Sequence, residues 1–219
     1  KNKSIEFISS EDSINETDYD YQVPILSLPK YLRQTAKDFQ TSKKLSLIVN
    51  KEKSNEYRER LKTNNYQKII GISWKSMSPV YKNCSIPLEK FISGIYSPNI
   101  AFVNIQYGDV KKEISDVMRK LGIKILEIEE LDIFNDIDGL ASLINACDEI
   151  VTIDNINTIL AGHLGKKTKL ILPKRNCYWT HGVNDKRNYF FTSLKYFRQS
   201  DETKFDQQLK EIKEEIKLK

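Results

Sequence analysis

The sequence predicts an α/β fold, a Rossmann-like parallel sheet of about six strands with helices on both faces. Three observations predict this fold. Short apolar runs recur along the chain, and amphipathic segments of helical period separate them. The first run, residues 68–74, is mainly apolar instead of alternating, which is typical of a parallel strand that is buried on both faces.

Six apolar runs are the expected strands. The first, residues 68–74, carries Ile69, Ile70 and Ile72 and suits a central parallel strand. The other five expected strands, in chain order, are residues 100–106, 124–128, 149–153, 168–172 and 194–197.

The segments between the runs have helix start and stop signals. Pro87 suits a first helical position, Asp109 and Asp136 suit N-caps, and Gly122 suits a C-terminal stop. The expected helices are residues 52–62, 87–96, 109–121, 136–146, 155–164 and 206–219; the last carries Leu209, Ile212 and Ile216 as its apolar stripe.

The start of the chain differs from the rest. Pro24 and Pro29 exclude a regular helix across residues 23–29, and residues 45–49 are a short apolar run that could form a strand. Three parts are therefore expected: a connector or remnant of an N-terminal Rossmann-like domain at 1–50, the main Rossmann-like domain at 51–200, and a C-terminal helix at 201–219.

Composition narrows the function classes. The 35 basic and 30 acidic residues give a net charge of +5 and are intermixed, which argues against a nucleic-acid binder. No apolar run is long enough to insert into a membrane. The three cysteines are far apart and the two histidines form no ligand motif, so we expect no metal site, free thiols and a cytoplasmic location.

The segment after the fourth expected strand is the first candidate site. The strand is followed at once by Asp154 and Asn155, either of which suits the N-cap of the next helix. Amides of the first turn and the helix dipole can hold a diphosphate, and Asn157 and Thr158 add side-chain donors. The alternative is that Asp154 and Asn155 only cap the helix, and local physics favours neither interpretation.

Other strand ends supply further candidates, because ligands of such sheets bind beyond the carboxyl ends of the strands. Lys75 and Ser76 follow the first strand, and Lys82 comes soon after; a lysine here either binds phosphate or is merely solvated. The sequence has neither GxGxxG nor GxxxxGK[ST], which weighs against an NAD-dependent enzyme and a P-loop nucleotidase. The remaining candidates for base or ribose contacts are Gln106, Tyr107, Asp132 and Phe134, and the alternative for the two aromatic residues is that they pack in the core.

Seven segments together resemble a known family. They are VPILSLPKYL (23–32), IIGISWKS (69–76), SIPLEKF (85–91), FVNIQYGDVKKEI (102–114), LDIFNDIDGLASLINACDEIVTIDN (131–155), LAGHLGKKTKLILPK (160–174) and SLKYFRQ (193–199). In this order and spacing they resemble the C-terminal region of bacterial tetratricopeptide-repeat proteins. That region is related to the ADP-heptose:lipopolysaccharide heptosyltransferases and, more distantly, to O-linked N-acetylglucosamine transferases.

The resemblance implies the C-terminal half of a GT-B fold, which grips a nucleotide diphosphate sugar as donor without a metal or other cofactor. It implies that Asp154, Asn155 and Ile156 form the diphosphate turn and that Lys75 and Ser76 face it, with nucleoside contacts from Gln106, Tyr107 and Asp109. The general base is expected outside this chain, in an N-terminal Rossmann domain. Helical repeats and a protein or glycan acceptor are the other expected partners.

The chain departs from the family pattern at this turn. Ile159 stands where the pattern D-[TN]-x-x-x-H-L-A-G-A-L-G has histidine, and His163 stands where it has alanine. The tryptophan-rich loop after the fifth strand is also altered, at residues 175–179. These departures favour an alternative, a non-catalytic nucleotide-binding or scaffold module attached to helical repeats.

Overall fold

The computed structural model describes residues 15, 17, 19–40, 46–62, 66–78, 84–174, 179–182, 188–200 and 205–217. The chain forms two compact units, residues 1–42 and 43–219. The first unit holds a 3-10 turn, η2 (Ile25–Ser27), and two short helices, α1 (Leu28–Leu32) and α2 (Ala36–Gln40).

One sequence prediction fails in the first unit. Helix α1 begins within the stretch from which the two prolines were expected to exclude a helix. Pro29 is tolerated because it lies in the first turn of α1, where a backbone N–H has no helical acceptor to lose.

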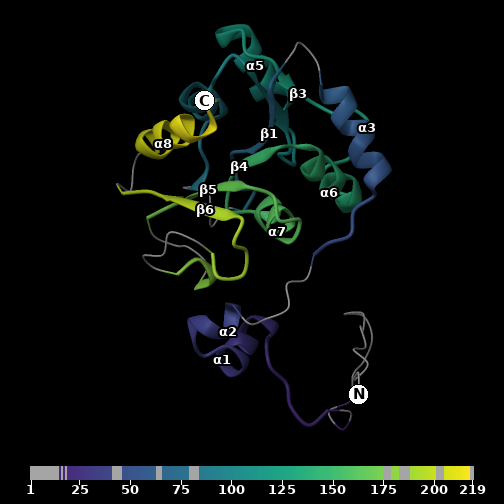
Figure 1. The fold of residues 1–219 in the computed structure, drawn as a ribbon, viewed down its shortest axis with the longest axis vertical. Helices are drawn as coiled ribbons and strands as arrows, with labels where there is room; N and C mark the ends of the chain where they lie inside the picture. Colours follow the sequence, from purple (N-terminus) through teal and green to yellow (C-terminus); the bar gives the residue numbers. More distant parts are fainter. Residues whose placement is uncertain are drawn as a thin grey trace. The chain divides into compact units, whose positions relative to one another are not determined.

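The second unit is a six-stranded parallel sheet with helices on both faces, which confirms the predicted fold class (Figure 1). The strand order is β3-β2-β1-β4-β5-β6, so the chain reverses direction across the sheet between β1 and β4. The strands are β1 (Lys68–Ser73), β2 (Ile100–Asn104), β3 (Ile125–Leu126), β4 (Glu149–Ile153), β5 (Thr168–Leu172) and β6 (Leu194–Arg198).

Two helical layers cover the sheet. One face carries α4 (Leu88–Ile95), α5 (Lys111–Leu121) and α8 (Asp206–Ile216); the other carries α3 (Lys51–Leu61), α6 (Ile137–Ala146) and α7 (Ile156–His163). Residues alternate between the layers along β1: Ile70 and Ile72 belong to the first core cluster, and Ile69 belongs to the second.

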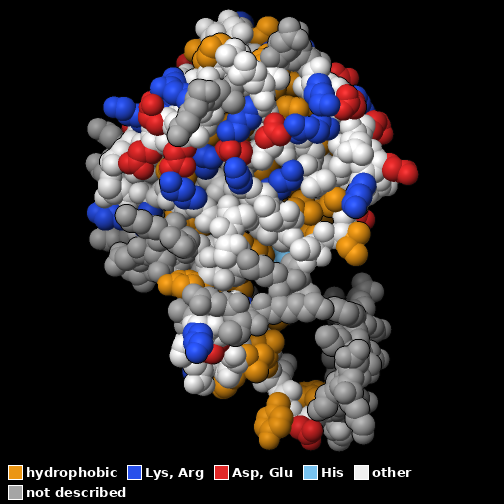
Figure 2. All heavy atoms as spheres, in the orientation of Figure 1, with side chains coloured by type: hydrophobic (Ala, Val, Ile, Leu, Met, Phe, Trp, Pro, Cys, Tyr) orange, Lys and Arg blue, Asp and Glu red, His pale blue; other side chains and the backbone are white. Residues whose placement is uncertain are grey.

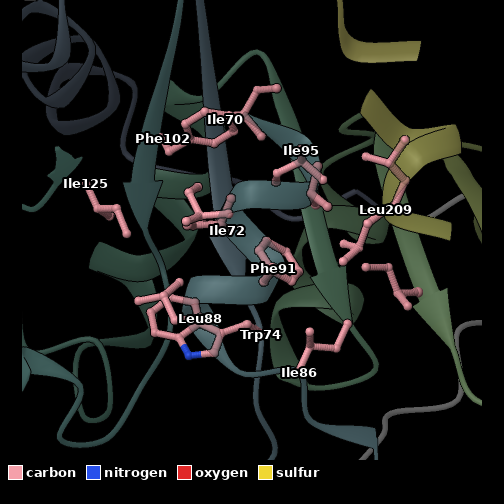
Figure 3. Packing of buried hydrophobic residues seen from close by; sticks show 14 of the residues in the cluster. Ile70, Ile72, Trp74, Ile86, Leu88, Phe91, Ile95, Phe102, Ile125 and Leu209 are labelled. Atoms are coloured by element: carbon pink, nitrogen blue, oxygen red, sulfur yellow. The ribbon is translucent and has the colours of Figure 1, made fainter. Parts of the chain in front are cut away.

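The core between β1 and α4 is closely packed. Ile72 of β1, Phe91 of α4 and Trp74 just after β1 come together, and Leu209 of α8 reaches the same cluster (Figure 3). A Cβ added at Gly94 would lie 2.7 Å from the Leu209 Cβ, so glycine allows α4 and α8 to approach this closely. Helix α8 is therefore an integral part of the core of the second unit.

Several element ends differ from the prediction. Residues 46–49 form no strand, and the third strand shrinks to β3. Helix α5 begins at Lys111, so its N-cap is Val110 and not Asp109 as predicted. The Asp109 side chain makes only a 3.4 Å contact with the Lys111 amide. Pro87 is the N-cap of α4 and lies one residue before the first helical position.

Candidate functional site

The carboxyl ends of β1, β2 and β4 are joined by a hydrogen-bonded chain of three side chains. Asn155, two residues after the end of β4, donates from Nδ2 to the Ser73 hydroxyl at 2.7 Å. Ser73 in turn donates to Gln106 Oε1 at 2.9 Å. The expected proximity of the loop after β1 and the start of α7 is therefore present, at the point where the strand order reverses.

Gln106 fixes the loop that follows β1. Its side-chain oxygen also accepts from the amides of Trp74 and Lys75, at 3.0 and 2.9 Å, and its Nε2 donates to the Tyr107 carbonyl at 3.0 Å. The residue is 1% exposed. The structure thus gives Gln106 a structural role, whereas the sequence and the resemblance suggested a contact to the nucleoside.

The first turn of α7 satisfies most of its own amides. Asn155 is the N-cap, as predicted, and Asn155 Oδ1 accepts from the Asn157 amide at 3.0 Å. The Asn155 amide donates to Thr158 Oγ1 at 3.5 Å, and the Thr158 amide donates to the Asn155 carbonyl at 3.0 Å. In the described part of the chain, the Ile156 amide has no such partner, so it is the donor that this turn offers to an anion.

Asn157 ties α7 to the end of β2. Its side chain is fully buried, and its Nδ2 donates to the Ile105 carbonyl at 3.0 Å. Its Oδ1 is buried without a hydrogen-bond partner. Thr158, also buried, donates to the Ile153 carbonyl at 3.2 Å. Both side chains support the turn, and neither is exposed toward a ligand.

Lys75 is held by a carboxylate. Its ammonium pairs with Glu113 of α5, which also accepts from the Trp74 indole N–H at 2.8 Å. The Lys75 Nζ lies 3.5 Å from the Asp109 carbonyl. Glu113 could not be predicted as a site residue, because nothing in the pattern of α5 distinguishes it from other surface carboxylates.

The hydrogen bonds of Ser76 stay within its own loop. The Ser76 amide donates to Ser85 Oγ at 3.0 Å, and the Ser76 hydroxyl accepts from the Ser78 amide at 3.2 Å. Lys82 lies outside the described residues. Lys75 is therefore the cation that the described part of this loop provides, and it is paired with Glu113.

Asp154 binds a histidine from the connection between β5 and β6. Its Oδ2 lies 3.0 Å from His181 Nε2, and His181 Nδ1 lies 2.9 Å from the Tyr196 hydroxyl of β6. His181 is 5% exposed, in the 3-10 turn η4 (Trp179–His181). No pattern in the sequence pairs His181 with Asp154, because 27 residues separate them.

An open cavity of about 830 Å³ lies beyond the ends of β2 and β3. Tyr107 and Phe134 are on its wall with their ring centroids 6.3 Å apart, and Phe134 is 67% exposed. The cavity lining carries four carboxylates and one ammonium, from Asp109, Glu127, Glu129, Asp132 and Lys111. Its charge therefore disfavours a phosphate and suits a neutral group that has hydroxyls to donate.

Asp132 is charged at the rim of this cavity. Hydrogen bonds from the Asn135 side chain, and then from the amides of Asn135 and Phe134, hold the pKa of Asp132 below its usual value. Three of the predicted nucleoside contacts, Tyr107, Asp109 and Asp132, thus line one cavity.

Charged groups elsewhere on the domain are intermixed. Lys and Arg side chains lie among Asp and Glu side chains on the face drawn in Figure 2. Among the described residues, no three His, Cys, Asp or Glu side chains gather as a set of metal ligands. No helix in the described ranges is long and apolar enough to span a bilayer.

Comparisons with known proteins bear on the fold. No family model matches the chain. Over 98 residues, 44% of the chain, it is 32% identical to Protein FlbA of Caulobacter vibrioides, of which it spans 16%. It is similar to a solved glycosyl transferase family 9 protein from Veillonella parvula, with a TM-score of 0.55 and 14% identity, over 73% of this chain and 44% of that one.

A further solved structure is that of a variant of the wall teichoic acid polymerase TagF. The alignment covers 63% of this chain and 37% of the TagF chain at 13% identity, and its TM-score of 0.34 is too low to show a shared fold. The similarity to the family 9 protein shows that the chain has a glycosyltransferase-like fold, as predicted. The chain spans less than half of that protein and a small part of FlbA.

Proposed function

We propose that this domain binds the nucleotide diphosphate sugar of a metal-independent glycosyl transfer. The observation that supports the proposal most strongly is the row of hydrogen-bonded side chains that runs from Asn155 through Ser73 to Gln106. It holds the start of α7 beside the end of β1, at the reversal of strand order, which is where ligands of such sheets bind.

The proposed ligand has its diphosphate at α7 and its nucleoside in the cavity beyond the ends of β2 and β3. The Ile156 amide and the α7 dipole attract the diphosphate, and Lys75 adds a positive charge once it leaves Glu113. Tyr107 and Phe134 offer aromatic surface for a base, and Asp132 can accept from a ribose hydroxyl.

In the proposed reaction, an acceptor hydroxyl attacks the anomeric carbon of the sugar. A new bond forms between the hydroxyl oxygen and that carbon, the bond to the diphosphate oxygen breaks, and the nucleoside diphosphate leaves. The Ile156 amide, the α7 dipole and Lys75 stabilise the charge that develops on the leaving group. The general base, the acceptor, an N-terminal Rossmann domain and helical repeats are proposed to lie outside this chain.

A second candidate is a non-catalytic nucleotide-binding or scaffold module. It is favoured by Ile159, which is 48% exposed on α7 and cannot hydrogen-bond to a phosphate or sugar as histidine would. Ile156 lies one turn earlier and is 40% exposed, so this face of α7 is apolar. A cytoplasmic location is proposed for either candidate, and the buried free thiol of Cys147 supports it.

Calorimetric titration with UDP, GDP, ADP and their sugar derivatives tests the proposal. The proposal predicts that one nucleotide series binds; the absence of binding by every series would contradict it. Slow hydrolysis of the bound sugar nucleotide by the full-length protein would favour the enzyme, whereas binding without turnover would favour the non-catalytic module.

A further inference from the structure

His181 connects three segments that are distant in the sequence. Its ring lies between Asp154, directly after β4, and Tyr196 of β6. The imidazole and the Tyr196 ring are nearly perpendicular, at 86°, with centroids 5.4 Å apart. His181 is 5% exposed, and each of its ring nitrogens contacts a protein group.

The two partners determine the protonation of the ring. An ionised carboxylate only accepts hydrogen bonds, so His181 Nε2 carries the proton that binds Asp154. In the neutral imidazole, Nδ1 is then an acceptor, and the Tyr196 hydroxyl donates to it. The histidine ring is therefore held in one orientation, with its Nε2 proton directed at Asp154.

The backbone around His181 is held as well. The Arg198 guanidinium of β6 donates to the carbonyl of His181 at 2.9 Å and to that of Gly182 at 3.3 Å. The imidazole is thus fixed through both its side chain and its main chain, and it in turn fixes Asp154 Oδ2.

Asp154 retains one carboxylate oxygen for another partner. Within the described residues, its Oδ1 makes no hydrogen bond, and the side chain is 19% exposed. It stands next to Asn155 and the α7 turn, where the proposed function seats a diphosphate. A carboxylate repels a phosphate but accepts strongly from a hydroxyl, so the chemistry at this position fits the sugar of the donor.

We propose that His181 is a positioning residue, which orients Asp154 so that Asp154 Oδ1 accepts from a hydroxyl of the donor sugar. The inference rests on the proposed function and adds to it the group that distinguishes a sugar nucleotide from the bare diphosphate.

The test compares affinities for bare and sugar-bearing nucleotides in the wild-type chain and its variants. The pairs are UDP with UDP-N-acetylglucosamine, GDP with GDP-mannose and ADP with ADP-glucose. We expect His181→Phe to weaken binding of the sugar nucleotide about tenfold, and of the bare diphosphate by about twofold or less, because one charge-assisted hydrogen bond is lost.

Two further variants distinguish positioning from folding. His181→Gln keeps an N–H donor for Asp154, so it should restore part of the preference for the sugar nucleotide. Asp154→Asn should lose the preference to the same extent as His181→Phe, and the double variant should lose no more. His163→Phe, a histidine substitution on α7, should keep the wild-type preference.

Failure of the proposed function and failure of the inference about His181 give different binding results. If the wild-type chain binds no nucleotide, the proposed function fails and this inference fails with it. If nucleotides bind and the preference for the sugar nucleotide is unchanged in His181→Phe, the inference alone is overturned.

Discussion

The Asn155 side-chain amide donates to the Ser73 hydroxyl at 2.7 Å, across the reversal point of the sheet. One residue therefore caps α7 and attaches it to the end of β1. This double role links the stability of the helix to the geometry of the candidate diphosphate seat.

Asn155→Ala is expected to lower the free energy of unfolding by about 1–2 kcal/mol, because a helix cap is lost, and to weaken nucleotide binding. Asn50→Ala is the matched control, since Asn50 caps α3 through the Lys53 amide and is not part of the cavity lining. Urea denaturation and calorimetric titration measure both effects. If both variants bind nucleotide with equal affinity, Asn155 caps α7 but does not contribute to the binding site.

Lys75→Ala is expected to weaken binding of a nucleoside diphosphate by about 1–3 kcal/mol, the scale of a charge-assisted hydrogen bond. Glu113→Gln should tighten binding, because the amide can still accept from the Trp74 indole but no longer competes for the Lys75 charge. Lys120→Ala, which breaks a pair with Glu89 on α4, is the control and should leave titrations unchanged. Unaltered affinity in Lys75→Ala would show that the lysine stays on Glu113.

Phe134→Ala is expected to weaken nucleotide binding by about 1–3 kcal/mol if its ring stacks on the base. Because Phe134 is 67% exposed, the substitution should hardly change stability. Met118→Ala, at an exposed apolar position of α5 outside the cavity lining, is the control. If Phe134→Ala and Met118→Ala bind nucleotide equally well, the cavity is not the seat of the base.

Glu149 should govern part of the acid sensitivity of the domain. Burial alone would raise its pKa, but hydrogen bonds from Lys169 and Lys68 outweigh burial and hold the pKa below the usual value of 4.5. A depressed pKa in the folded state gives stability that is present above pH 4.5 and is lost as the pH falls through the folded pKa.

Glu149→Gln should therefore destabilise the domain by about 3–5 kcal/mol at pH 7, because buried lysines lose their carboxylate. It should also flatten the fall in stability on acidification. Lys195→Gln, which breaks an exposed pair with Glu215, is the control and should retain the wild-type pH dependence. Urea midpoints measured between neutral and acidic pH check both expectations, and an unchanged slope in Glu149→Gln would contradict them.

Ile212→Ala tests whether α8 belongs to the core. Ile212 is fully buried, and a cavity at such a site costs about 2–5 kcal/mol. Leu121→Ala, at a partly exposed position at the end of α5, should cost much less. Thermal unfolding followed by circular dichroism measures both, and equal losses would argue against α8 as a core element.

The sequence predicted the sheet well because buried parallel strands are continuously apolar. Glu149–Ile153 and Thr168–Leu172 were predicted with the bounds that the structure gives. The third strand was predicted too long, because β3 is an edge strand that pairs only with Phe102 and Val103 of β2. Strand length at an edge depends on pairing, which apolar patterning does not encode.

The candidate site was predictable in position but not in detail. The resemblance implied that the loop after β1 faces the start of α7, and the hydrogen bond between Asn155 and Ser73 brings these two segments together at the ends of the paired strands β1 and β4. The Lys75–Glu113 and Asp154–His181 pairs did not follow, because each depends on side-chain orientation and on segments remote in sequence. Those two pairs decide which groups are available to a ligand.

The most direct test of the account is a backbone amide NMR titration of the chain with the nucleotide that calorimetry selects. If the diphosphate binds at the α7 turn and the nucleoside in the cavity, the largest shifts should occur at Ile156, Asn157 and Lys75. A second group of shifts should occur around Tyr107 and Phe134. Saturable shifts confined to another part of the domain, or none at all, would contradict it.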